Sequence, residues 1–215
     1  MKTALQKALL YGICDLSYRS IEQALPASRQ LLEGGVGILQ LRAKGHPPES
    51  LLSLSIQLKA LCDEFHVPFV VNDHVELARQ SDAHALHLGQ DDGSLADARA
   101  RLSPHVLIGR STHSLQQARC ALEEGADYIG FGPLFPTPTK AGRPGIGLSD
   151  IAEMQASIGS KIPAFCIGGI KAENLAAVLA AGASRIVVVS ELLSARDIQS
   201  ATAALHQRLS KNPNS

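Results

Sequence analysis

The stretch Leu31–Arg42, LLEGGVGILQLR, contains the pattern that decides the fold. An amphipathic segment ends in glycines, and an apolar run typical of a strand begins within a few residues. Glycine supplies the left-handed backbone conformation in which a helix can end without strain. The same joint recurs at Leu122–Gly132 (LEEGADYIGFG) and Leu179–Ser190 (LAAGASRIVVVS), so the sequence predicts repeated helix-to-strand units.

Short apolar runs and longer amphipathic segments alternate along the chain. Such runs are typical of strands buried on both faces, as in a parallel sheet covered by helices. The predicted strands are Tyr11–Asp15, Gly37–Arg42, Pro68–Asp73, Ala85–Leu88, Val106–Arg110, Tyr128–Gly132, Pro163–Ile167 and Arg185–Val189. The predicted helices are Ser20–Glu33, Pro48–Phe65, Val75–Gln80, Leu95–Arg101, Leu115–Glu124, Leu148–Ser157, Lys171–Ala181 and Ala195–Leu209. Strands that alternate with helices pair in parallel through crossovers.

Eight strand–helix units in 215 residues predict an α/β protein with a single (β/α)8 TIM barrel spanning residues 1–215. An open doubly wound sheet is the alternative, but no GxGxxG dinucleotide fingerprint follows the first strand. We expect residues 1–10 to form an extra N-terminal helix. We expect residues 133–147, the longest stretch without a helix or strand pattern, to form an active-site loop.

Composition and charge exclude several classes of protein. Lys+Arg and Asp+Glu number 20 each, so the chain has no overall basic field for nucleic acid or for an anionic membrane. No apolar run reaches the ~18–20 residues of a membrane span, and the N-terminus lacks the apolar block of a signal peptide. The four cysteines form no CxxC pair, which favours reduced thiols in the cytoplasm. The sequence leaves the oligomeric state open.

Polar side chains follow the second predicted strand, where a barrel of this type places its active site. Gln40, Arg42 and Lys44 share one face of an extended chain, while Leu41 and Ala43 share the other. Two cations and an amide on one face are suited to binding a polyanion.

Asp73 and Asp92 follow the third and fourth predicted strands, so both carboxylates can converge on one cation. Mg²⁺ takes one or two carboxylates and completes its shell with water and phosphate oxygens. Alternatively, each aspartate could cap the helix that follows it. Asn72 could cap instead, or could bind a ligand amine.

Hydroxyls and a cation follow the fifth and sixth predicted strands. Ser111 can donate to a phosphate oxygen and His113 can carry a proton, while the absence of GxSxG argues against a hydrolase nucleophile. Thr137, Thr139 and Lys140 lie in the long loop, which we expect to be a lid that carries phosphate ligands.

A second anion site is predicted after the last two strands. Barrels often bind phosphate there through backbone N–H groups, and the paired glycines Gly168 and Gly169 permit the close approach this needs, with Ser190 nearby. Two anion sites, one with a metal, suggest a transferase that joins two phosphorylated molecules.

Eight motifs in order carry a resemblance to a known family: QLRAK, VND, HLGQDD, GRSTHS, ADYIGFGP, PTPTK, IGGI and VVVS. Over nearly its whole length the sequence resembles thiamine phosphate synthase. The resemblance implies a (β/α)8 barrel that couples 4-amino-5-hydroxymethyl-2-methylpyrimidine diphosphate to a thiazole phosphate and releases pyrophosphate, with Mg²⁺ as cofactor. Its partners would be small phosphorylated molecules.

The resemblance also implies roles for individual residues. The residues implied to bind the pyrimidine diphosphate are Gln40, Leu41, Arg42, Ala43, Lys44, Asn72, Ser111 and Lys140, of which Ser111 and Lys140 are also implied to be catalytic. The residues implied to bind the thiazole phosphate are Thr137, Pro138, Thr139, Gly169, Val189 and Ser190. Asp73 and Asp92 would bind the metal.

Two alternatives remain at this point. A relative on the same fold is a thiazole tautomerase that uses a histidine in the GRSxHS segment, where this chain has His113. That relative lacks the metal carboxylates and the lysine of the PTxTK loop, whereas this chain has Asp73, Asp92 and Lys140. A non-catalytic regulatory barrel that binds thiamine intermediates is the third possibility.

Overall fold

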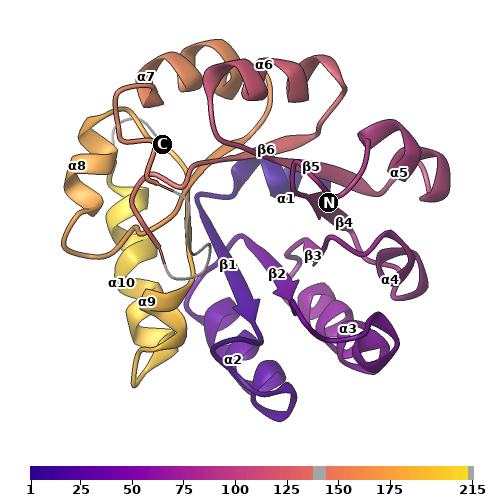
Figure 1. Cartoon of the computed structure of the whole chain (residues 1–215). Coiled ribbons are helices and arrows are strands. Elements are labelled where there is room, and N and C mark those ends of the chain that lie inside the picture. The colour runs from indigo at the N-terminus through magenta and orange to yellow at the C-terminus, as the bar shows by residue number, and fades with distance from the viewer. Residues whose placement is uncertain (138–143, 213–215) are drawn as a thin grey trace.

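Eight parallel strands close into a barrel in chain order, and helices surround it as an outer ring (Figure 1). The computed structural model describes residues 1–137 and 144–212. The predicted (β/α)8 barrel is confirmed. Pro138, Thr139 and Lys140 lie outside the described residues.

The elements have the following bounds. The strands are β1 Leu10–Asp15, β2 Ile38–Arg42, β3 Phe69–Asn72, β4 Ala85–Leu88, β5 Leu107–Thr112, β6 Tyr128–Phe131, β7 Ala164–Ile167 and β8 Ile186–Val188. The helices are α1 Lys2–Lys7, α2 Ile21–Glu33, α3 Pro48–Glu64, α4 Val75–Gln80, α5 Leu95–Arg101, α6 Leu115–Glu123, α7 Ile151–Met154, α8 Leu175–Ala180, α9 Ser190–Leu193 and α10 Ile198–Ser210, with a π-helical turn at Gln155–Gly159 after α7.

Most predicted bounds shift by one to three residues; α10, for example, begins at Ile198 instead of Ala195. Three differences matter most here. Strand β5 continues through Ser111 and Thr112, because both residues pair with β6, so Ser111 lies in a strand and not in the loop after it. Helix α8 begins at Leu175 instead of Lys171, since the Lys171 N–H donates to Asn174 Oδ1 and holds a turn before the helix. The short helix α9 was not predicted, and it begins at Ser190.

Side chains alternate between two apolar regions along each strand. Those that point outward pack beneath the helices, as Leu39 and Leu41 do. Those that point inward fill the barrel, where the rings of Tyr11, Tyr128 and Phe165 meet edge to face or tilted. A parallel barrel with both faces covered needs strands that are apolar on both sides, and this is why the strand segments read as nearly continuous apolar runs.

Helix α1 closes the end of the barrel where the strands begin. Leu5 and Ala8 are buried with the interior side chains of the barrel. Gly37 allows this approach, because a Cβ there would lie 2.7 Å from Cβ of Ala8. Arg185 secures the helix with a hydrogen bond of 3.0 Å from Nη2 to the Gln6 carbonyl oxygen.

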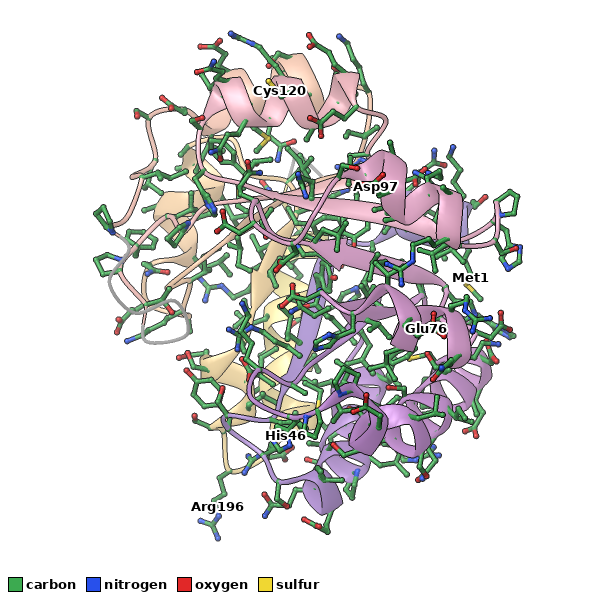
Figure 2. The ribbon with its side chains drawn as sticks, turned by 45° about the vertical axis from the view of Figure 1, so that its right-hand side comes forward. Met1, His46, Glu76, Asp97, Cys120 and Arg196 are labelled. Carbon is green, nitrogen blue, oxygen red and sulfur yellow. The ribbon has the colours of Figure 1, made fainter. Side chains whose placement is uncertain are left out.

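The outer helices carry the charged surface, as Glu76 on α4 and Asp97 on α5 illustrate (Figure 2). Within residues 1–137 and 144–212, no helix has the length and apolar character required to cross a membrane.

Candidate functional site

A cavity opens at the carboxyl ends of the strands, opposite α1. Its volume is about 860 Å³, counted with the solvent at its mouth. Ten of the residues singled out in the sequence line it: Gln40, Arg42, Asn72, Ser111, His113, Thr137, Gly168, Gly169, Val189 and Ser190. They come from six different strands and the segments that follow them, and the closed barrel brings them to one rim.

Arg42 lines the first wall of the cavity, and an ion pair with the neighbouring strand holds it. Asp15 and Arg42 are aligned in the β1–β2 ladder. Arg42 Nη1 lies 2.5 Å from Asp15 Oδ2, and Asp15 Oδ1 accepts hydrogen bonds from the backbone N–H and the hydroxyl of Ser17. A buried carboxylate needs such partners for both oxygens.

Below this pair lies a hydrogen-bonded chain of inward-facing side chains. Gln40 Nε2 donates to the Tyr11 hydroxyl at 2.7 Å, and that hydroxyl lies 3.4 Å from the hydroxyl of Tyr128. Burial strongly raises the pKa values of both tyrosines, so both phenols stay neutral. They form a polar floor that carries no charge.

His87 and Ser111 form the opposite wall. His87 Nε2 lies 2.9 Å from Ser111 Oγ, and both side chains are buried. The Ser111 backbone is also held, because Gln90 Nε2 donates to its carbonyl oxygen at 2.5 Å. The serine hydroxyl therefore has a fixed position at the cavity surface.

His113 lies where the same wall meets the rim. Its Nδ1 hydrogen-bonds to the carbonyl oxygen of Gly132. A carbonyl can only accept, so Nδ1 carries a proton, and when the ring is neutral its lone pair lies on Nε2. That neutral form has the lone pair that a base needs at the cavity edge.

Asp73 and Asp92 meet beside the cavity, in a shallow pocket that also contains Lys44. Their carboxyl groups hydrogen-bond to each other, and Lys44 Nζ lies 3.5 Å from Asp73 Oδ2. Burial raises the pKa of Asp73 to about 6, and the hydrogen bond to Asp92 adds to the rise. Partial burial opposes ionisation of Asp92, but the hydrogen bonds from Asp73 and from the Gly89 N–H outweigh it and lower its pKa.

Neither aspartate caps a helix. Helix α4 has His74 at its N-cap without a side-chain bond, and α5 is capped by Ser94, whose hydroxyl accepts from the Asp97 N–H. The capping alternative for Asp73, Asp92 and Asn72 is therefore excluded. Two acids that share a proton form a pair that a divalent cation can bridge once that proton is lost.

The glycines after β7 form a backbone cradle on the far side of the cavity. Gly168 and Gly169 have φ values of +101° and +65°, in the left-handed region that favours glycine. A Cβ on Gly168 would overlap Pro133, and one on Gly169 would lie 2.7 Å from Cβ of Phe135. Asn174 Nδ2 donates to the Gly169 carbonyl oxygen at 2.8 Å and fixes the turn.

The remaining sequence-predicted residues lie elsewhere. The side chains of Leu41 and Ala43 are buried on the outer face of β2, beneath the helices, and do not line the cavity. The start of the long loop is tied to the barrel, because the Leu134 N–H donates to the Ile167 carbonyl oxygen of β7. The Ile146 N–H donates to the Pro133 carbonyl oxygen and so joins the end of the loop to its start.

Among the described residues, no group of three or more His, Cys, Asp or Glu side chains could hold a metal ion. The Asp73–Asp92 pair is therefore a partial donor set. It suits a hard cation such as Mg²⁺, which keeps water and takes phosphate oxygens as its other ligands.

Sequence reasoning missed His87, Tyr11 and Asp15. The alternation of side chains could have found them, because His87 shares a face with Ala85 on β4, and Tyr11 and Asp15 share a face of β1. His84 and His87 have an HxxH spacing in the sequence. The structure separates the two, since His84 Nε2 contacts Asp63 while His87 faces the cavity.

Known proteins resemble the chain over most of its length. Residues 10–192 match a family model described as thiamine monophosphate synthase. The chain is 44% identical over 190 residues to the thiamine-phosphate synthase of Thermus thermophilus, covering 88% of this chain and 91% of that protein. It is 41% identical to the thiamine-phosphate synthase of Bacillus cereus, covering 98% and 97%. The solved structure of a thiamine phosphate pyrophosphorylase from Pyrococcus furiosus matches with a TM-score of 0.86 at 32% identity, covering 98% of this chain and 99% of that one.

Proposed function

The chain belongs to the thiamine monophosphate synthase family, a family of transferases, and on that premise we propose its substrates. They are 4-amino-5-hydroxymethyl-2-methylpyrimidine diphosphate and a thiazole phosphate, and the products are thiamine phosphate and pyrophosphate. The observation that carries the proposal is that Arg42 and Ser111 line one side of the cavity and the backbone of Gly169 lines another. Two phosphorylated molecules can therefore bind side by side.

Mg²⁺ is part of the proposal, with Asp73 and Asp92 as its protein ligands. The raised pKa of Asp73 supports this assignment, because two acids this close hold a proton where a cation can replace it. When bound, the ion would neutralise charge on the diphosphate. Lys44, 3.5 Å from Asp73, adds a second positive charge at the same place.

The reaction proposed needs positioning more than acid–base chemistry. The C–O bond to the diphosphate breaks, and a C–N bond from the thiazole nitrogen forms. Arg42, Asn72 and Ser111 would hold the leaving pyrophosphate, where hydrogen bonds to developing charge lower the barrier. The 4-amino group of the pyrimidine donates electrons to the carbon that is left, so we propose a dissociative path. The thiazole nitrogen loses no proton, so no general base is required.

The second substrate would bind at the other side of the cavity. Gly168 and Gly169 bring backbone close to the space that a phosphate would occupy, and Ser190 adds a hydroxyl at the start of α9. Thr137, which lines the cavity, and Thr139 complete the proposed set. Lys140 is proposed as the cation of the loop on the basis of family resemblance.

An assay with both substrates tests the function. We expect thiamine phosphate and pyrophosphate to form with Mg²⁺ and not without it. Asp92→Asn should abolish the Mg²⁺-dependent coupling while the circular dichroism spectrum stays that of the wild type. The adjacent Asp91→Asn, outside the carboxyl pair, is the matched control and should keep its activity. A wild-type chain that binds both substrates without turnover would instead be a regulatory barrel.

Thiazole tautomerisation is a second candidate, because His113 lines the same cavity with the lone pair of its neutral ring on Nε2. His113→Asn keeps a donor near the Nδ1 position but removes the base. If tautomerisation occurs here, this variant should lose isomerisation and retain coupling. Isomerisation that persists in His113→Asn contradicts this assignment.

We also propose a cytoplasmic location. The four cysteines are free thiols in the structure, three of them buried, which suits a reducing compartment.

A further inference from the structure

We propose that Asp15 is a positioning residue: it fixes the guanidinium of Arg42 in the orientation that binds the diphosphate. The inference rests on the proposed function, and it assigns a role to a residue outside the eight family motifs. Asp15 ends β1, one strand away from Arg42 at the end of β2, and the two are paired in the strand register.

Asp15 and Arg42 differ in their position relative to the cavity. The side chain of Asp15 is 1% exposed and that of Arg42 is 12% exposed, and only Arg42 lines the cavity. The carboxylate therefore lies behind the guanidinium. A guanidinium carries five N–H donors in a rigid fork, so one bond to Asp15 sets the plane of the fork without using its capacity for an anion.

The carboxylate is itself held in place. Asp15 Oδ1 accepts from the Ser17 N–H at 3.0 Å and from the Ser17 hydroxyl at 2.5 Å, and Oδ2 accepts from Arg42. With both oxygens engaged and almost no exposure, Asp15 is not placed to exchange protons with a substrate. Its contact with the ligand is indirect, through Arg42.

Two possible roles of Asp15 predict opposite changes in anion affinity when its charge is removed. If only net charge mattered, removing a negative charge close to the diphosphate would tighten anion binding. If Asp15 positions Arg42, removing its charge weakens the contact that orients the guanidinium, and anion binding weakens. Small losses of orientation are costly, because a misplacement of about 1 Å can reduce rates by about 100-fold.

Asp15→Asn tests this, since asparagine has nearly the same shape. We expect the KM for the pyrimidine diphosphate to rise about tenfold or more, with little change in the KM for the thiazole phosphate. The affinity for inorganic pyrophosphate with Mg²⁺, measured by calorimetry without turnover, should fall by a similar factor. In an Arg42→Ala background, adding Asp15→Asn should cause no further loss of affinity and no further rise in this KM, because Asp15 supports anion binding only through Arg42.

Asp127→Asn is the matched control. Asp127 also pairs with an arginine, Arg99, at 2.7 Å and also accepts a backbone N–H, from Ile108, but neither residue lines the cavity. It should lower the melting temperature and leave both KM values unchanged. If Asp15→Asn fails to fold, Asp15→Glu replaces it: this variant keeps the charge but moves the carboxylate by one methylene, and it should raise the same KM.

The outcomes separate the inference from the function on which it rests. A wild-type chain that does not couple the two substrates overturns the proposed function and the inference together. A wild-type chain that couples them, with Asp15→Asn binding pyrophosphate as tightly or more tightly, overturns the inference alone. A further loss of affinity on adding Asp15→Asn to Arg42→Ala also overturns it.

Discussion

Gly109 leaves the space that the ring of Tyr128 occupies inside the barrel. A Cβ at Gly109 would overlap three atoms of this ring, which is packed against Tyr11, Phe165 and His87 and has no room to move. We expect Gly109→Ala to lower the free energy of unfolding by about 1–3 kcal/mol, as overpacking of a core does. Urea denaturation measures the change.

Gly130 provides the comparison for this prediction. It lies one strand away and also faces inward, but a Cβ there would be 3.7 Å from Cε1 of His87, an ordinary contact. Gly130→Ala should unfold near the wild-type midpoint and should instead narrow the cavity. Equal stability losses in the two variants would contradict the role assigned to the Tyr128 ring.

Single residues were predictable where neighbouring strands determine their position. Asp73 and Asp92 were expected to meet because adjacent parallel strands end at one rim, and their carboxyl groups do hydrogen-bond. Tyr11 and Tyr128 come from β1 and β6, and their contact depends on the way the closed barrel crosses its own interior. The periodicity of one segment does not reveal which side chains meet across the interior of the barrel.

His84 joins α3 to the start of β3 through two hydrogen bonds. The Phe69 N–H donates to its Nδ1 at 3.0 Å, and its Nε2 lies 3.0 Å from Asp63 Oδ1, near Lys59 and Asp82. An acceptor at Nδ1 requires the neutral ring. Burial lowers the pKa of His84, with Lys59 acting in the same direction and Asp63 opposing it.

The free energy of unfolding should therefore depend on pH through His84. The unfolded chain takes up a proton near pH ~6.5, and the folded chain does so only at lower pH. The contribution of His84 is thus fully present above that value and is lost as the pH falls towards the lowered pKa. His84→Asn keeps an acceptor for the Phe69 N–H but cannot titrate, so it should show a shallower loss of stability between pH 7.5 and 5.5, about one pH unit on either side of the reference pKa. Identical slopes in denaturation experiments would contradict this reading.

Helix α6 begins with a cap whose effect can be measured separately. The hydroxyl of Ser114 accepts from the Gln117 N–H. Ser114→Ala should cost about 1 kcal/mol, because one N–H of the first turn loses its partner. Ser114→Asp, which restores an acceptor, should recover most of the loss in thermal unfolding.

The amphipathic pattern located most helices, including the six-residue helix Val75–Gln80, whose predicted bounds are the observed ones. Helices with several turns, such as Pro48–Glu64, and strands with strong apolar runs were located to within a few residues. Helix α9 has four residues, too few for a helical period to show, and was missed. Helix α7 is also four residues long and continues as a π-helical turn, whose hydrogen bonds shift by one residue.

Leu5 connects the N-terminal helix to the interior of the barrel. It is fully buried among residues from β1, β2 and the other strands. Leu5→Ala should lower the free energy of unfolding by about 2–5 kcal/mol, because it leaves a cavity at the closed end. Gln6→Ala, at the exposed neighbouring residue, is the control and should change the free energy of unfolding very little. Similar losses of stability in both variants would mean that Leu5 contributes through helix stability and not through its burial at the closed end of the barrel.

Closure of the whole molecule could be inferred from the sequence only by counting units. Strand β8 pairs with β1 across almost the full chain, with Leu10 opposite Ile186. No local pattern distinguishes this contact from an open sheet edge. The argument for a barrel was the number eight and the missing dinucleotide fingerprint, and the register confirms it.

Because α1 closes one end of the barrel, it limits how ligands exchange between the cavity and solvent. Leu5 and Ala8 fill the end of the barrel where the strands begin. A ligand therefore enters and leaves the cavity only at the carboxyl ends of the strands. A product must therefore leave through that opening before a new substrate can take its place.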